Sequence, residues 1–201
     1  GASFDDCLDK CRDFINEIRT SKNTQLLTLL LDGTQRSGKT AIAAKLALES
    51  DFPFVKLISP ESYVGFSEHA KISAIVKVFE DAYKSHLSLI ILDDIERLIE
   101  FIHIGPRFSN ALLQALLVLI KKCPPNLNRK LMIIGTTTMK GVLGEMDLVD
   151  CFNICLSVPC LQEASEISTV LRHFSDDSTV SEQIAEWTSA NHTTGIPIKN
   201  L

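Results

Sequence analysis

The chain has 201 residues, of which 45% are hydrophobic and 22% charged, and its formal net charge at pH 7 is -5. This length and composition are those of a soluble globular domain with room for one full core and a small appendage. The acidic balance disfavours nucleic acid or an anionic membrane surface as a partner. Apolar runs such as residues 111–120 are too short and too interrupted to form a transmembrane segment.

The cysteines include no C-x-x-C pair, so we expect reduced thiols in a cytoplasmic protein. Cys7 and Cys11 are four positions apart on a predicted helix and are therefore neighbours. A metal site would need more ligands than these two, so none is predicted there. The full set is Cys7, Cys11, Cys123, Cys151, Cys155 and Cys160.

Residues 4–19 carry apolar side chains at helical spacing, which predicts an amphipathic helix. A polar connection follows, and we take residues 1–24 as an N-terminal helix and connection. The apolar run 26–31 then predicts a buried strand, and the Ala-rich run 41–48 predicts a helix.

Between that strand and that helix stands G-T-Q-R-S-G-K-T, which fits the phosphate-binding pattern G-x-x-x-x-G-K-T. Its residues, all predicted to bind the nucleotide, are Gly33, Thr34, Gln35, Arg36, Ser37, Gly38, Lys39 and Thr40. Backbone N–H groups and the positive end of the helix would face a polyphosphate. Lys39 would bridge the β- and γ-phosphates, and the Thr40 hydroxyl would bind Mg²⁺. The alternative is a chance match, a glycine turn with a surface lysine, which the strand–helix context disfavours.

Strands are predicted next at residues 54–58 and 87–92, with a loop at 63–66 and a helix from Ser67 or Glu68 to about Ser85 between them. The second of these strands ends directly at Asp93 and Asp94. An apolar strand that delivers an acidic residue at its carboxyl end is a Walker-B element, in which Asp93 would hold Mg²⁺. The alternative is an aspartate that caps a strand–helix junction.

Further along, helices are predicted at residues 95–102, 109–122 and 142–146, and strands at 131–135 and 152–158. Two more helices, 163–174 and 180–190, follow without a strand between them. Strands that alternate with helices predict a parallel sheet with crossover helices. The predicted fold class is therefore α/β, a three-layer P-loop NTPase: residues 25–160 form the nucleotide-binding core, and 161–201 begin a truncated helical lid.

The order of these elements resembles the AAA ATPases, and no guanine-reading N/T-K-x-D motif is present. From residue 31 to about 138, the chain resembles the second ATPase domain of the N-ethylmaleimide-sensitive fusion protein family, the vesicular-fusion AAA ATPases. The most specific stretches are Asp-Asp-Ile-Glu-Arg-Leu at 93–98 and Gly-Pro-Arg-Phe-Ser-Asn at 105–110. The resemblance fades after about Pro159.

The resemblance implies an ATP- and Mg²⁺-binding domain of a homohexamer, which with SNAP adaptors disassembles SNARE complexes. It also implies a cytoplasmic protein, peripheral to vesicle and organelle membranes through its partners. In the family, the second domain binds ATP tightly and holds the hexamer together, whereas the first does most of the hydrolysis. The adaptors and SNARE complexes would bind parts of the full-length protein that this chain does not contain.

Three departures from AAA motors suggest good binding and poor hydrolysis. Asp94 stands where the motors have a water-polarising glutamate, and a base displaced by about 1 Å can lose on the order of a hundredfold in rate. Thr138 stands at the sensor position, which is usually asparagine. Residues 139–171 contain no arginine to serve as a finger, a loss worth about 10³–10⁵ in related phosphoryl transfer. Asp93, Asp94 and Thr138 are thus the predicted catalytic residues.

By resemblance, lysines would replace the finger at the γ-phosphate. Lys121 would act from a neighbouring subunit, and Lys199 from the lid. The alternatives are a cation at a helix C-terminus for Lys121 and a solvated surface lysine for Lys199. Thr34, Gln35 and Arg36 depart from the usual residues of the family's phosphate loop.

Two rival hypotheses remain open at this stage. One is an active AAA unfoldase that threads a substrate chain past Tyr63, since Tyr-Val-Gly at 63–65 occupies the AAA pore-loop position. The other is a solitary nucleotide-binding module that forms no oligomer. The hydrolysis rate separates the first rival from an ATP-holding domain, and the oligomeric state separates the second.

Overall fold

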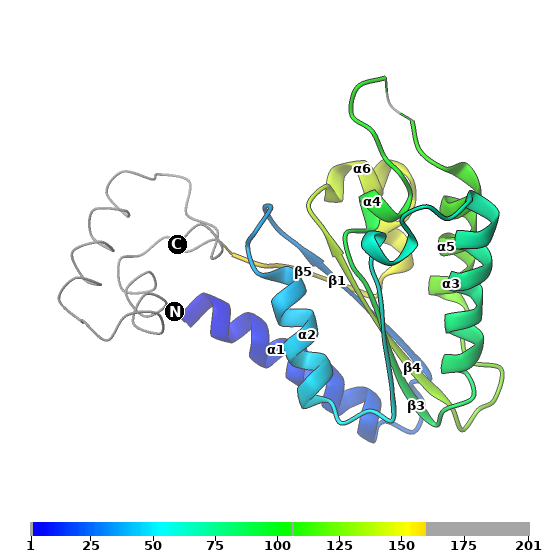
Figure 1. The fold of residues 1–201 in the computed structure, drawn as a ribbon. Coiled ribbons are helices and arrows are strands. Elements are labelled where there is room, and N and C mark those ends of the chain that lie inside the picture. The colour runs from blue at the N-terminus through cyan, green and yellow to red at the C-terminus, as the bar shows by residue number, and fades with distance from the viewer. Residues whose placement is uncertain (1, 106, 160–201) are drawn as a thin grey trace, which may run out of the picture.

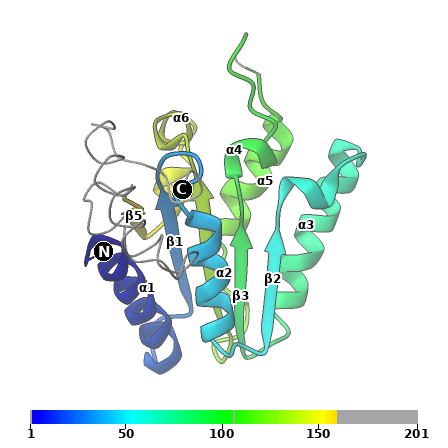
Figure 2. The same cartoon turned by 60° about the vertical axis from the view of Figure 1, so that its left-hand side comes forward.

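A computed structural model describes residues 2–105 and 107–159 of the chain. Within them, five strands form one sheet in the order β2-β3-β4-β1-β5, and every neighbouring pair is parallel (Figures 1 and 2). The carboxyl ends of all five strands therefore lie along one edge of the sheet. The strands are β1 Leu26–Asp32, β2 Phe54–Ile58, β3 Leu87–Leu92, β4 Lys130–Thr137 and β5 Ile154–Ser157.

Helices cover both faces of the sheet and give the molecule three layers, as predicted. α1 and α2 pack on one face, and α3 and α5 pack on the other (Figure 1). The α-helices are α1 Ala2–Thr20, α2 Lys39–Glu49, α3 Glu68–Ala82, α4 Ile95–Leu98, α5 Asn110–Lys121 and α6 Lys140–Glu145. Two short 3₁₀ turns, η1 Pro60–Tyr63 and η2 Val149–Cys151, complete the described part of the chain.

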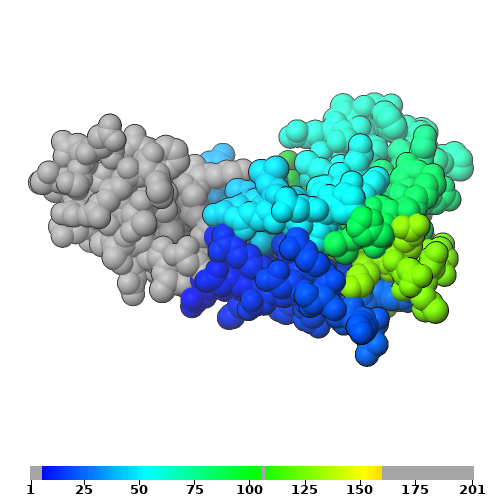
Figure 3. Space-filling model, turned by 90° about the horizontal axis from the view of Figure 1, so that it is seen from below, coloured from blue at the N-terminus to red at the C-terminus, as the bar shows by residue number. Residues whose placement is uncertain are grey.

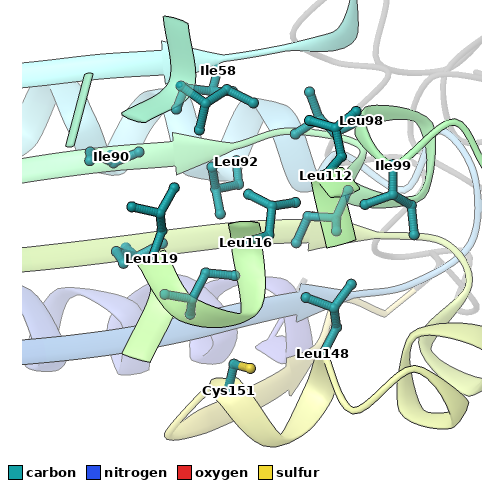
Figure 4. Packing of buried hydrophobic residues seen from close by; sticks show 14 of the residues in the cluster. Ile58, Ile90, Leu92, Leu98, Ile99, Leu112, Leu116, Leu119, Leu148 and Cys151 are labelled. Atoms are coloured by element: carbon teal, nitrogen blue, oxygen red, sulfur yellow. The ribbon is translucent and has the colours of Figure 1, made fainter. Parts of the chain in front are cut away.

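The larger core lies between the sheet and the α3–α5 layer. Figure 4 shows Leu112, Leu116 and Leu119 of α5 in the same cluster as Ile90 and Leu92 of β3. The strands are apolar on both faces because helices cover both, which is why they appear in the sequence as continuous hydrophobic runs. Ser109 caps α5 and accepts a hydrogen bond from the N–H of Leu112 at 3.1 Å, so the helix starts where the sequence predicts.

The smaller core lies under α1 and α2. Ile15 and Ile18 of α1 are buried together with Leu29 and Leu31 of β1. The end of α1 is also held by a lysine from β4, because Lys130 Nζ donates to the carbonyl oxygens of Ile18, Arg19 and Ser21 at 2.9, 3.1 and 2.6 Å. Seen from below, the end of α1 (blue) lies beside the segment that leads into β4 (yellow-green) (Figure 3).

The structure confirms the predicted strands at 54–58 and 87–92 at both ends, but the predicted helix at 95–102 is too long. α4 stops at Leu98 because Glu100 adopts a positive φ of 60°. The chain then turns back on itself, and Ile102 forms an isolated antiparallel bridge with Arg107. The apolar residues after Leu98 thus belong to a short hairpin-like excursion before α5.

Some predictions lie outside the described residues. The helices expected at 163–174 and 180–190, and with them the lid at 161–201, are among these, so the predicted domain boundaries stay predictions. No helix within residues 2–105 and 107–159 combines the length and apolarity that crossing a membrane requires.

Candidate functional site

The sequence motifs converge at the carboxyl edge of the sheet. β1 ends at Asp32 and leads into residues 33–40, β3 ends beside Asp93, and the central strand β4 ends in a run of threonines. β1 lies between β4 and β5. The chain runs from β1 to β2, β3 and β4 on one side of it, and then crosses to β5 on its other side. In open parallel sheets, ligands bind outside the carboxyl ends at such a switch point.

The two glycines of the phosphate-binding pattern are required for different reasons. Gly38 precedes α2 with φ 96°, a left-handed conformation that glycine adopts without strain. A Cβ on Gly33 would stand 2.8 Å from the carbonyl oxygen of Val158, so this glycine is needed for close packing against the chain after β5. Arg36, inside the loop, also has a positive φ, 68°.

Lys39 is 5% exposed and folds back over its own loop. Its Nζ donates to the carbonyl oxygens of Gly33 and Thr34 at 2.9 and 2.7 Å. Burial lowers the pKa of Lys39, and the nearby acidic groups, Asp94 first among them, oppose that shift. The ammonium is therefore held at the loop by carbonyl oxygens, whose partial negative charge has the same sign as the charge of an incoming phosphate.

Thr40 and Asp93, the residues predicted to hold Mg²⁺, are in direct contact. Thr40 Oγ1 donates to Asp93 Oδ1 at 2.9 Å, and Thr136 Oγ1 donates to the same oxygen at 2.7 Å. Hydroxyl and carboxylate oxygens are the hard donors that Mg²⁺ prefers, so this pair fits the ion chemically. Within the described residues no group of three His, Cys, Asp or Glu side chains could hold a metal unaided.

Asp94 lines a pocket together with Lys39 and Thr40. Its backbone has a positive φ of 48°, and its N–H donates to Thr136 Oγ1 at 2.9 Å. Burial raises the pKa of the Asp94 carboxyl, and the charge of Asp93 raises it further. The pocket has a volume of about 150 Å³ and is lined by Gln35, Arg36, Gly38, Lys39, Thr40, Asp94, Arg97 and Thr138.

Glu96 is a site residue that the sequence analysis missed. It is 5% exposed, and its carboxylate accepts hydrogen bonds from Thr137 Oγ1 at 2.8 Å, Thr138 N at 2.8 Å and Thr138 Oγ1 at 2.6 Å. Because the Thr138 hydroxyl donates its hydrogen to Glu96, only its lone pairs are left for other partners. The signal available in the sequence was an acidic residue two positions after Asp94, on the first turn of the following helix.

Of the two predicted lysines outside the motifs, Lys121 lies away from this pocket. Lys121 is the last residue of α5, where it is exposed beside Cys151. The carbonyl of Cys151 accepts a hydrogen bond from the Thr28 hydroxyl, near the start of β1. Thr28 is five positions before the loop, roughly 16 Å along the strand, so Lys121 lies toward the opposite end of the sheet from its own chain's pocket. Lys199 is outside the described residues.

Tyr63 is only 8% exposed and packs edge-on against Phe66, with ring centroids 5.7 Å apart. The exposed large side chains of that loop are Val64, at 81%, and Phe66, at 50%. The tyrosine that the pore-loop hypothesis needs at the surface therefore lies in the core cluster of the α3 side.

Comparison with known proteins places this site in a family. A profile of the ATPase family associated with various cellular activities (AAA) matches residues 29–159. The chain is 47% identical over 170 residues to a vesicle-fusing ATPase of Dictyostelium discoideum, 50% over 165 residues to one of Arabidopsis thaliana, and 40% over 189 residues to one of Caenorhabditis elegans. These matches cover 85%, 81% and 92% of the chain but only 23%, 22% and 23% of the relatives. The chain thus spans less than a quarter of their length.

Proposed function

The chain belongs to the AAA family of ATPases, and from that membership we propose that it is the second ATPase domain of a hexameric vesicle-fusing ATPase. In this proposal the domain binds Mg-ATP tightly, hydrolyses it slowly and uses it to hold the ring together. The similarity to vesicle-fusing ATPases, which extends over four-fifths or more of the chain, supports the choice of machine.

The observation that carries the binding proposal is the contact between the two nucleotide motifs. Thr40 of the phosphate loop and Asp93 of the Walker-B strand meet at 2.9 Å, and Lys39 lies in the same pocket. A nucleotide would lie with its phosphates at the start of α2, where backbone N–H groups and the helix dipole favour negative charge. Thr40 and Asp93 would hold the Mg²⁺ that neutralises these phosphates. The preference for adenine is a property of the family.

Slow hydrolysis follows from what faces the γ-phosphate position. Asp94 is one methylene shorter than the glutamate of AAA motors, so its carboxylate reaches about 1 Å less far toward an attacking water. Thr138 donates its hydroxyl hydrogen to Glu96, so it can orient a water molecule through its lone pairs but cannot donate to a phosphate. Residues 139–171 supply no arginine, and arginine fingers contribute about 10³–10⁵ in related reactions.

The partners proposed are those of the whole machine. A second copy on each side would complete a homohexamer, and SNAP adaptors with SNARE complexes would bind parts of the full-length protein outside this chain. The domain would work in the cytoplasm, at vesicle and organelle surfaces, through those partners. The active-unfoldase alternative is not favoured, because Tyr63 is packed into the core.

The test is the light-scattering mass of the chain with and without Mg-ATP, with phosphate release measured on the same samples. We expect ATP to assemble the wild-type chain while release stays slow, and Lys39→Ala to stay monomeric. ATP would then promote ring formation through linkage, because it binds the assembled state more tightly than the monomer.

Two results would contradict the proposal in different ways. Fast phosphate release, comparable with that of AAA motors, would show that Asp94 and Thr138 are competent and would favour the motor hypothesis. Tight ATP binding without any assembly would instead favour a solitary nucleotide-binding module.

A further inference from the structure

The nucleotide pocket contains an arginine to which neither sequence motif assigns a role. Arg97 lines the pocket together with Lys39, Thr40, Asp94 and Thr138. Lys39 and Thr40 belong to the phosphate loop, whereas Arg97 comes from α4, three positions after Asp94. Among the described residues that line the pocket, Arg97 is the one cationic residue from outside the phosphate loop. The pocket therefore has a positive charge on the side that faces the loop.

Hydrogen bonds and burial fix the backbone of Arg97. Asp94 precedes α4 with a positive φ of 48°, and its carbonyl oxygen accepts from the N–H groups of Arg97 and Leu98 at 2.9 and 3.0 Å. The two neighbours of Arg97, Glu96 and Leu98, are buried. Glu96 is also hydrogen-bonded to Thr138. The start of α4 is thus held to the end of β4, and Arg97 has a defined place beside Asp94 and Thr138.

The side chain of Arg97 points away from the core. Successive side chains of a helix are about 100° apart, so burial of both neighbours leaves Arg97 on the outer side, where it is exposed. Within the described residues, the ion pairs with carboxylates are made by Arg12, Lys71 and Lys84. The guanidinium of Arg97 is therefore not committed to a carboxylate and is available to a ligand in the pocket.

A polyphosphate held by the phosphate loop would bring its last phosphate to this side of the pocket. Lys39 would reach the β- and γ-phosphates, and the Mg²⁺ at Thr40 would bridge the same two groups. Asp94 and Thr138 would then lie beside the γ-phosphate, because the attacking water must be in line with the bond that breaks. Arg97 shares the pocket with these two residues, so the phosphate that it meets is the terminal one.

Arginine suits this position chemically. Its planar guanidinium donates two parallel hydrogen bonds to the oxygens of one phosphate, and such charge-assisted pairs are among the strongest hydrogen bonds in proteins. ADP ends one phosphate earlier than ATP, so in an ADP complex the guanidinium of Arg97 would have no phosphate oxygen to bind. A contact of this kind distinguishes the two nucleotides by the presence of one charged group.

We propose that Arg97 binds the terminal phosphate of the ATP held by its own chain and makes the site prefer ATP to ADP. This inference rests on the proposed Mg-ATP site and adds the residue that distinguishes the two nucleotides. The contact forms when ATP binds, before any chemistry, so it strengthens binding and does not by itself speed hydrolysis. Assembly by ATP would then depend on Arg97, because only the nucleotide that it favours would stabilise the ring fully.

The experiment is a calorimetric titration of the full chain with Mg-ADP and with the β,γ-imido analogue of Mg-ATP, which resists hydrolysis. The variants are Arg97→Ala and Arg97→Lys, and Arg107→Ala, which removes an exposed arginine outside the pocket lining, is the matched control. We expect Arg97→Ala to weaken binding of the analogue about 10–100-fold and binding of ADP less than about twofold. Arg97→Lys should lie between wild type and Arg97→Ala, because lysine offers a point charge in place of the fork. The control should bind both nucleotides as wild type does.

Steady-state hydrolysis supplies a measurement that a purely structural role would not change. When chemistry is slow, KM reports the binding of ATP, so Arg97→Ala should raise KM by the same factor and leave kcat within about threefold. A fall in kcat at unchanged KM would overturn the inference, because the contact would then exist only in the transition state.

The titrations give further results that would overturn the inference. Equal losses for ADP and the analogue in Arg97→Ala would mean that Arg97 acts on the pocket in general, and no loss for either would mean that it does not bind the nucleotide. Equal affinity of the wild-type chain for the two nucleotides would overturn the inference without any variant. A wild-type chain that binds neither nucleotide would overturn the proposed Mg-ATP site together with this inference, which separates that failure from the others.

Discussion

Three consecutive threonines at the end of β4 organise the acidic residues that follow β3. Thr136 donates to Asp93, while Thr137 and Thr138 both donate to Glu96. The sequence was sufficient to predict that Lys39, Thr40 and Asp93 lie close together, because their motifs have fixed spacing. It was insufficient for Glu96, because the partner threonines are about 40 positions away and meet it only through the pairing of β3 with β4. The sequence also predicted Thr138 at the sensor position but gave no sign that its hydroxyl hydrogen is donated to Glu96.

Replacing Glu96 should reduce turnover through Thr138. We expect Glu96→Ala to lower kcat on the order of tenfold with little change in KM for ATP, because the Thr138 hydroxyl loses its fixed direction. Glu96→Gln should retain most activity, since its amide oxygen still accepts from Thr138 N–H and Oγ1. Single-turnover hydrolysis measures this effect, and a Glu96→Ala/Thr138→Val double variant tests the coupling.

The double variant should be no slower than Thr138→Val alone if Glu96 acts only through Thr138. Additive losses would show that Glu96 has an independent role. Urea unfolding provides the structural control: Glu96→Ala should lose about 1–3 kcal/mol, because buried donors on Thr137 and Thr138 are left without their acceptor.

Lengthening Asp94 should raise the rate of hydrolysis. We expect Asp94→Glu to increase kcat by about 10–100-fold, because the added methylene brings the carboxylate about 1 Å closer to the position of the attacking water. Asp94→Asn, which keeps the size and removes the base, should lower it. Phosphate release at saturating Mg-ATP measures both, and an Asp94→Glu variant no faster than wild type would show that reach is not what limits this site.

At the scale of elements, α1 is attached to the domain by side chains at its middle and at its C-terminal end. Arg12 pairs with Glu49 of α2 at 2.9 Å, while Lys130 binds the carbonyl groups at the C-terminal end. Helical periodicity was enough to predict α1, α3 and α5, because burial of one stripe determines the pattern. Periodicity failed for α4. The apolar residues at 99–102 lie in a turn, where they are buried or form a strand-like bridge, and their spacing alone does not distinguish that turn from a helix.

Removal of the Lys130 contacts should loosen α1. We expect Lys130→Met, which keeps the aliphatic stem, to lower the free energy of unfolding by about 1–3 kcal/mol, because charge-assisted bonds to three helix-end carbonyls are lost. The exposed Lys56→Met on β2 is the matched control and should change it by less than about 0.5 kcal/mol. Urea denaturation measures both variants, and equal effects would mean that solvent satisfies the α1 carbonyls as well as Lys130 does.

At the scale of the whole molecule, the sheet separates two lysines that the nucleotide hypothesis links. Lys39 lies at the carboxyl edge and Lys121 near the amino edge, so one chain cannot bring both to one nucleotide. The P-loop fold itself was predictable from sequence, because two motifs and the strand–helix alternation agree. The relation between copies was not, because it depends on surfaces that no motif describes.

Lys121 should therefore matter for assembly and not for binding by a single chain. We expect Lys121→Ala to abolish Mg-ATP-dependent assembly while leaving the ATP affinity of the monomer unchanged. Lys122→Ala, its exposed neighbour, removes the same charge and should assemble as wild type does. Light-scattering mass and nucleotide titration test both variants. Normal assembly of Lys121→Ala would mean that Lys121 serves only as a cation at the end of its helix.

The strand order also determines how long β1 waits for its neighbouring strands during translation. β1 is bonded only to β4 and β5, and β4 is made roughly 100 residues after it, on the order of 5–20 s at ordinary rates of translation. During that interval the leucine-rich first strand has emerged from the ribosome without either neighbour. α1, which is made before it and shares a core with Leu27, Leu29 and Leu31, is available to shield one face from the start. The N-terminal helix would in this way act as an internal chaperone for the first strand.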